Sequence, residues 1–226
     1  MKFKGFTKNT ISFLQDLKLN NHKEWFEQNR STYEEHLLKP LKMLATDLEP
    51  VIKSIDTKIE TAPSINKTIS RIYRDTRFSN DKTPYRTDAW VSFKRPAKVW
   101  GNVPEFFMFF TPEEYQVGMG FYAATPANME KFRQNIHLYP ERFQEIVDHY
   151  DSQDTYVLYG ENYKRILPNQ LPAGFQTWIQ KKNLYLSRSK KIDELFFSDS
   201  LEKEIEKAFV FNADFYRFFM ECLDFD

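Results

Sequence analysis

The chain has 226 residues, of which 41% are hydrophobic and 17% aromatic, so one substantial core can form. Its 32 lysines and arginines balance 32 aspartates and glutamates, which leaves a formal net charge of zero. A neutral chain has no overall field that attracts nucleic acid or anionic membranes, so an anion site requires a local concentration of positive charge.

Helical spacing dominates the first third of the chain. Thr7 can cap a helix whose apolar residues recur every three or four positions. Asn21 can cap a second helix. A third helix extends from about Ser31, and Pro40 either bends it or begins a new helix.

From Thr61 onward the pattern changes to that of strands. The expected strands are residues 69–73, 89–94, 106–110 and 115–122. A loop rich in polar residues and proline follows the first, and the Gly101-Asn102 pair marks a turn. Thr111-Pro112-Glu113-Glu114 joins the last two strands and predicts a hairpin.

Helical spacing returns after Thr125-Pro126. Pro140 ends the first of these helices and can occupy the first turn of the next. Further elements are expected as short strands at 155–159 and 184–186, a helix around 175–179 and a closing helix from about Ser198 towards Leu223.

The order of helices, then neighbouring strands, then helices predicts a single α+β domain over residues 1–226. N-terminal helices precede a central, mostly antiparallel sheet, and C-terminal helices follow it. Strict βαβ alternation is absent. The sequence also contains neither GxGxxG nor GxxxxGK[ST], which argues against the common nucleotide-binding loops.

One segment, residues 71–86, concentrates positive charge. Its cations are Arg71, Arg74, Arg77, Lys82 and Arg86, and its anions are Asp75 and Asp81. Five minus two leaves +3 in a neutral chain. Arginine forks suit bidentate contacts with carboxylate or phosphate, and Ser79 and Tyr85 add a hydroxyl and a ring.

The same segment resembles the signature of a widespread family of uncharacterised proteins, a domain of unknown function with the pattern R-I-x-R-D-T-R-F-S-x-D-K-T-P-Y. The resemblance extends to Asn29-Arg30, Gly118-Met119-Gly120 and Tyr185-Leu186-Ser187-Arg188. Ser189-Lys190 departs from the family, whose members have proline at the second position there. The resemblance implies the kind of protein and no activity.

Two interpretations of the cluster stay open. It can be a structural network of arginines and aspartates that only fastens a long loop. It can instead be a pocket for a phosphorylated or carboxylated small molecule, with Arg188 as a sixth cation. Asp75 or Asp81 would then orient an arginine or act as a general base, and an arginine partner favours the orienting role.

Other chemistries find little support in the sequence. The four histidines have neither HxxxH nor HExxH spacing, so we expect no metal site, and no motif indicates a cofactor. The single cysteine, Cys222, excludes an intramolecular disulfide. With neither a signal-peptide pattern nor a membrane-spanning run, we expect a cytoplasmic protein without membrane contact.

Two further partners are conceivable. Rings and cations interleave at Trp90, Phe93, Lys94, Arg95, Lys98 and Trp100, as in single-stranded nucleic-acid binding, but strand alternation explains the same residues. The stripe of Phe209, Phe211, Phe215, Phe218 and Phe219 indicates core packing, and an exposed part of it would make the chain an interaction module or homo-oligomer.

Overall fold

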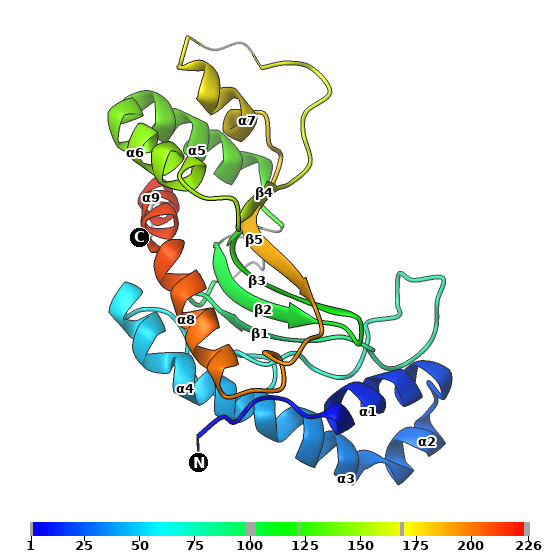
Figure 1. Ribbon diagram of the computed structural model, residues 1–226. Helices are drawn as coiled ribbons and strands as arrows, with labels where there is room; N and C mark the ends of the chain where they lie inside the picture. Colours follow the sequence, from blue (N-terminus) through cyan, green and yellow to red (C-terminus); the bar gives the residue numbers. More distant parts are fainter. Residues whose placement is uncertain (1, 98–102, 122, 168–169, 224–226) are drawn as a thin grey trace. The chain divides into compact units, whose positions relative to one another are not determined.

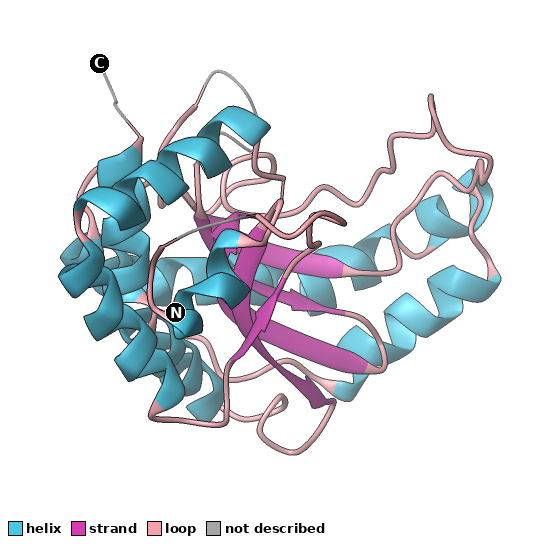
Figure 2. Cartoon of the chain, turned by 90° about the horizontal axis from the view of Figure 1, so that it is seen from above, coloured by secondary structure: helices cyan, strands magenta, loops and turns pink. Residues whose placement is uncertain are grey.

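The computed structural model describes residues 2–97, 103–121, 123–167 and 170–223 (Figure 1). Within these residues the chain is an α+β protein with a five-stranded antiparallel sheet and helices before and after it, as predicted. The strands are β1 (Ala89–Phe93), β2 (Glu105–Phe110), β3 (Glu114–Phe121), β4 (Val157–Tyr159) and β5 (Leu184–Lys191). They lie side by side in the order β1-β2-β3-β5-β4. Figure 2 draws the strands in magenta.

The chain divides into two compact units, each assembled from separate segments. Unit 1 comprises Met1–Phe93, Phe107–Val117 and Ser189–Ala208, and unit 2 comprises Lys94–Phe106, Gly118–Arg188 and Phe209–Asp226. Strands β2, β3 and β5 contribute residues to both. A single domain over residues 1–226 stays a prediction.

The N-terminal helices of unit 1 follow the predicted spacing. They are α1 (Lys8–Leu19), α2 (Lys23–Gln28), α3 (Arg30–Tyr33), the π-helical turn η1 (Glu34–Leu38) and α4 (Lys39–Ile55). Thr7 is the N-cap of α1, and Pro40 lies in the first turn of α4. The prediction that Asn21 caps α2 is wrong, because His22 is the N-cap and accepts a hydrogen bond from the Trp25 amide.

Residues 69–73 were expected to form a strand, and this prediction is wrong. Ile69 and Tyr73 form only isolated bridges, to Val91 and Tyr85 respectively. Pro84 accepts a hydrogen bond from the Arg74 amide but has no N–H to continue the ladder. The signature segment therefore connects α4 to β1 instead of joining two strands of the sheet.

The predicted hairpin is confirmed, since β2 and β3 are joined by a turn in which the Thr111 amide donates to the Glu114 carbonyl at 2.9 Å. Strand β4 pairs antiparallel with β5, with Leu158 opposite Leu186. Parts of three predictions lie outside the described residues. These are Gly101 and Asn102 of the expected turn, Tyr122 of an expected strand, and Lys98 and Trp100 of the nucleic-acid footprint.

Unit 2 has an aromatic core. Its helices include α5 (Pro126–Leu138), α6 (Pro140–Asp151), the 3-10 turn η2 (Ala173–Phe175), α7 (Gln176–Ile179) and α9 (Ala213–Cys222). The sequence predicts a single closing helix, and this prediction is wrong. Two helices form instead: α8 (Ser200–Phe211) ends before α9 begins, and Asn212 is the N-cap of α9. Phe219 stacks on Phe132 with ring centroids 4.4 Å apart.

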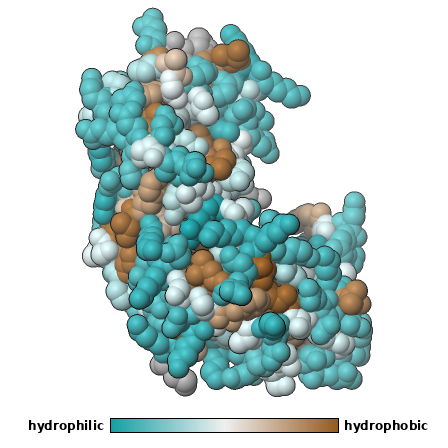
Figure 3. Space-filling model, in the orientation of Figure 1, coloured by the Kyte–Doolittle hydropathy of each residue, from teal (hydrophilic) through white to brown (hydrophobic). Residues whose placement is uncertain are grey.

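The phenylalanine stripe belongs mainly to this core. Phe209, Phe215, Phe218 and Phe219 are buried, and Phe211 is half-buried against Tyr156 and His149. Hydrophilic residues cover much of the face seen in Figure 3. None of the described helices combines the length and apolar character that crossing a bilayer requires.

Two glycines allow β3 and β5 to approach closely. A Cβ atom on Gly118 would lie 2.2 Å from the Leu186 carbonyl oxygen, and one on Gly120 would lie 2.3 Å from the Tyr185 Cα. Both contacts involve backbone atoms, which cannot rotate away. Glycine at positions 118 and 120 therefore allows the Gly118-Met119-Gly120 stretch to lie directly against the Tyr185-Leu186-Ser187 stretch.

Gly118→Ala should therefore destabilise the protein by about 1–3 kcal/mol, the usual cost of overpacking. Gly174→Ala is the matched control, because its Cβ would meet only the Val147 Cγ1 atom, at 3.9 Å. Urea denaturation of both variants tests this. Equal stability of the two variants would contradict the close-approach argument.

Candidate functional site

We call residues 70–88 the signature arm. Within unit 1 the arm runs out and folds back antiparallel to itself without forming regular strands. At its base the Ser70 amide donates to the Trp90 carbonyl at 3.0 Å. The Arg86 amide donates to the Ile72 carbonyl and the Arg74 amide to the Pro84 carbonyl, both at 2.8 Å. These bonds bring the arginines at the two ends of the signature into one region.

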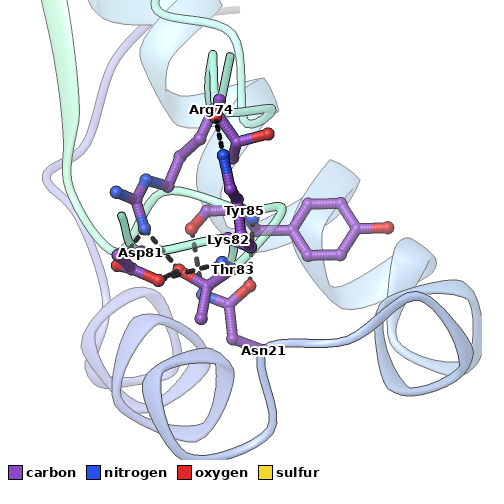
Figure 4. Close-up of polar contacts among 7 residues, drawn as sticks. Asn21, Arg74, Asp81, Lys82, Thr83 and Tyr85 are labelled. Atoms are coloured by element: carbon purple, nitrogen blue, oxygen red, sulfur yellow. Dashed lines mark hydrogen bonds and ion pairs between the residues drawn. The ribbon is translucent and has the colours of Figure 1, made fainter. Parts of the chain in front are cut away.

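Asn21 fastens the arm to the helical group. Its side-chain amide donates to the Tyr85 carbonyl at 2.9 Å, and its oxygen accepts from the Tyr85 amide at 3.0 Å (Figure 4). The Tyr85 ring is buried and stacks on Phe26 with centroids 4.3 Å apart. The ring points away from Arg74 and Asp81 in Figure 4, so it contributes to packing.

Arg74 is held by Asp81 and by the Thr83 hydroxyl. Asp81 also accepts from the Thr83 amide at 2.9 Å and the Thr83 hydroxyl at 2.8 Å. The Thr83 amide, then Arg74, then the Thr83 hydroxyl lower the pKa of Asp81 to about 2. This carboxylate is ionised at neutral pH and fixes one guanidinium.

Arg77 binds Asp75 through two parallel bonds, Nε to Oδ1 at 3.0 Å and Nη2 to Oδ2 at 2.7 Å. The Arg77 side chain, with its amide adding a further bond, holds the pKa of Asp75 well below its usual range. Phe78 beside it is 94% exposed, with the Arg77 guanidinium 5.6 Å from its ring. Arg77 and Phe78 thus lie at the exposed end of the arm.

The remaining cations of the arm have different surroundings. The Arg86 Nε donates to Asp88 Oδ1 at 2.8 Å, and its guanidinium lies 4.5 Å from the centre of the Trp90 ring. Lys82 donates to the Thr76 carbonyl at 2.8 Å. Arg71 makes no hydrogen bond or ion pair with any residue that the structure describes, although it contributes to lowering the pKa of Asp75.

A hollow of about 600 Å³ lies beside the arm, wholly within unit 1. Its lining residues are Lys18, Asn21, Arg71, Arg74, Asp75, Asp81, Thr83, Tyr85, Arg86, Thr87 and Asp88. Two other hollows, of about 380 and 280 Å³, contain no comparable arginine cluster. We call this hollow the arm cavity.

The arm cavity gathers part of the predicted site. Arg71, Arg74 and Arg86 line it together with both aspartates, Asp75 and Asp81. Arg77, Ser79 and Lys82 are not among its described lining residues. Arg188 is a buried residue of unit 2, and its membership of the site stays a prediction.

Sequence reasoning missed the four lining residues that lie outside the segment 71–86. Thr87 and Asp88 directly follow the signature, so extending the segment by two residues would have found them. Lys18 and Asn21 come from the end of α1 and the turn after it. No local pattern connects them with an arm that begins at residue 70.

The cavity lining is close to electrically balanced. Four cations, Lys18, Arg71, Arg74 and Arg86, face three carboxylates, Asp75, Asp81 and Asp88, which leaves +1. Within the described residues, no three histidine, cysteine, aspartate or glutamate side chains are close enough to hold a metal ion. The arrangement has the chemistry to bind an anion through its guanidinium groups.

The proposed nucleic-acid footprint is only partly described. Trp90 is covered by the Arg86 guanidinium, and Phe93 is buried. Lys94 pairs with Glu105 at 3.1 Å. Trp90, Phe93 and Lys94 thus already contact other residues of the chain.

Comparison with protein-family models identifies the class of protein. Residues 9–218 match the family described as a conserved hypothetical protein, domain of unknown function DUF2461. The match covers nearly the whole chain, so the protein belongs to this family. A comparison with curated proteins found no match.

Asn21→Ala should lower the free energy of unfolding by about 1–3 kcal/mol, because it leaves the amide and carbonyl of a buried residue without partners. Asn80→Ala, on the exposed end of the same arm, is the control and should change it little. Thermal denaturation compares the two. Equal stability would show that the Asn21 bonds do not fasten the arm.

Ionised Asp81 should stabilise the arm above about pH 4, and this contribution should disappear as the pH falls towards the pKa of the folded state. Carboxyl NMR titration measures that pKa directly. Arg74→Gln should raise it only part of the way to its ordinary value, because the Thr83 amide still donates. An unchanged pKa in Arg74→Gln would contradict the role of the ion pair.

Proposed function

We propose that this protein binds a phosphorylated or carboxylated small molecule in the arm cavity, with Arg71 as a principal contact. The observation that carries the proposal is that Arg71 lines the cavity while forming no hydrogen bond or ion pair with a described residue. A guanidinium presents five N–H donors in a planar fork, which matches the oxygens of a carboxylate or phosphate.

Two further arginines support the same proposal because they are already oriented. Asp81 holds Arg74, and Asp88 holds Arg86 through Nε only. Each therefore keeps terminal N–H groups that form no bond with described side chains. Oriented donors bind an anion with less loss of side-chain entropy than mobile donors do.

The aspartates fit an orienting role in this proposal. A general base works best with a pKa near the operating pH, and the pKa values of Asp75 and Asp81 are both lowered. We therefore treat both as residues that orient arginines, and we assign no reaction to the protein. We also propose that the protein works in the cytoplasm, where thiols stay reduced, since its single cysteine, Cys222, is free.

The alternative is that the cluster only fastens the arm. The paired bonds between Asn21 and Tyr85, and the contacts of Arg74 with Asp81 and Thr83, favour this structural role. The buried phenylalanines of α9 offer no support for association through that helix. Ligand binding separates the two functions, because a purely structural network gains no stability from added anions.

Arg71→Gln should abolish most of the thermal stabilisation that inorganic phosphate gives the parent protein. Phosphate at about one hundred times its Kd should stabilise the parent by roughly 2.7 kcal/mol, which is a rise of several degrees in Tm. Differential scanning fluorimetry at constant ionic strength measures the shift.

Lys82→Gln is the matched control, because it removes an equal charge from the same arm outside the cavity lining, and Lys82 donates to the Thr76 carbonyl and not to a lining carboxylate. It should retain the phosphate response. If phosphate and simple carboxylates leave the parent Tm unchanged, or if Arg71→Gln responds as the parent does, the structural role is the correct one.

A further inference from the structure

The charge of the arm cavity limits how much negative charge a ligand can carry. Three carboxylates stand among its four cations, and hydrogen bonds from Thr83 and Arg77 keep two of them, Asp81 and Asp75, ionised at neutral pH. A phosphate monoester carries about two negative charges at pH 7. A triphosphate carries more, and its additional oxygens would lie against fixed carboxylates, which repel them.

The cavity also lacks a free aromatic face within its described lining. Tyr85 is the aromatic residue in that lining, and its buried ring stacks on Phe26 and has the tilted ring of Tyr73 at 5.3 Å. The neighbouring Trp90 ring is covered by the Arg86 guanidinium. A nucleobase would therefore find no ring to stack on among the described lining residues, although stacking is the usual source of base affinity.

What the cavity does offer, besides its arginines, is a set of hydroxyl partners. Asp88 uses Oδ1 for Arg86, while its Oδ2 accepts no hydrogen bond from a described residue. Thr87 adds a hydroxyl that can donate or accept. An ionised carboxylate oxygen is a strong acceptor for a ligand hydroxyl group.

The volume fits a small molecule of this kind. A hollow of about 600 Å³ is within the range of small-molecule sites and exceeds what a lone phosphate ion fills. Arg71 is available to the anionic group, and Asp88 is available to hydroxyl groups elsewhere in the same cavity.

From these features we infer that the arm cavity binds a small, polyhydroxylated, non-aromatic compound with a single phosphate or carboxylate group, of the sugar-phosphate or sugar-acid type, in preference to nucleotides and polyphosphates. This inference rests on the anion binding proposed above and specifies its ligand class. The arginines select the anionic group, and Asp88 selects the hydroxylated body.

Isothermal titration calorimetry tests the inference with a defined panel. The hydroxylated anions are glucose 6-phosphate, ribose 5-phosphate, glycerol 3-phosphate and gluconate. The comparison ligands are inorganic phosphate, AMP and ATP. At least one hydroxylated anion should bind about tenfold more tightly than inorganic phosphate, as expected for one added hydrogen bond to a charged group. Both nucleotides should bind more weakly than that compound.

Asp88→Asn separates the two parts of the ligand. The amide oxygen can still accept from Arg86 Nε, but the negative charge that attracts ligand hydroxyls is removed. The ratio of the best hydroxylated anion's affinity to that of inorganic phosphate should fall to about one. Asp16→Asn, an exposed position on α1 outside the cavity lining, should leave the ratio unchanged.

The possible failures are distinguishable. If no ligand of the panel binds, the proposed anion site and this ligand class both fail. If inorganic phosphate binds but no hydroxylated anion binds more tightly, or if ATP binds best, the ligand class is wrong while the anion site stands. An unchanged affinity ratio in Asp88→Asn would overturn the role given to Asp88.

Discussion

The paired hydrogen bonds between Asn21 and the backbone of Tyr85 are the constraint on which the arm cavity depends. They join a turn after α1 to a segment 64 residues further along the chain. Because the arm forms only isolated bridges, its own ladder contributes little stability. The Tyr85 ring, stacked on Phe26, supplies the apolar part of the same attachment.

Once the arm is attached, its charges are largely compensated by near neighbours in sequence. Arg77 pairs with Asp75 and Arg86 pairs with Asp88, and the partners in both pairs are two positions apart. Ion pairs at or near the surface add little stability, but they define the direction of each guanidinium. Arg71 lacks such a partner among the described residues. Substituting Arg71 therefore tests ligand binding without removing an ion pair that holds the arm in place.

The structure also changes the balance of charge from that of the signature alone. The segment 71–86 carries +3 when its charges are counted along the chain. Compared with that segment, the cavity lining lacks Arg77 and Lys82 and includes Asp88 and Lys18, so the lining carries +1. For the proposed anion site, this difference favours a ligand with a single anionic group over a strongly anionic one.

The sequence by itself determined much of the local structure. Thr7 as a cap, Pro40 at the start of a helix and the hairpin at Thr111 follow from preferences that act over a few residues. The α+β class and the arginine-rich segment also follow from the order and content of the chain. The family resemblance extended this to the kind of protein.

Only the tertiary structure decided what depends on distant residues. Asn21 has the right chemistry for a helix cap, but the backbone of Tyr85 competes for its side chain, and that competition is invisible in a local pattern. The closing helix is interrupted at Asn212, between α8 and α9. Lys18 reaches the arm cavity because α1 and the arm pack together in unit 1. A side chain such as that of Asn21 can form hydrogen bonds with many backbone groups. Which of them becomes its partner depends on the groups that the folded chain brings near it, and a local sequence pattern does not show this.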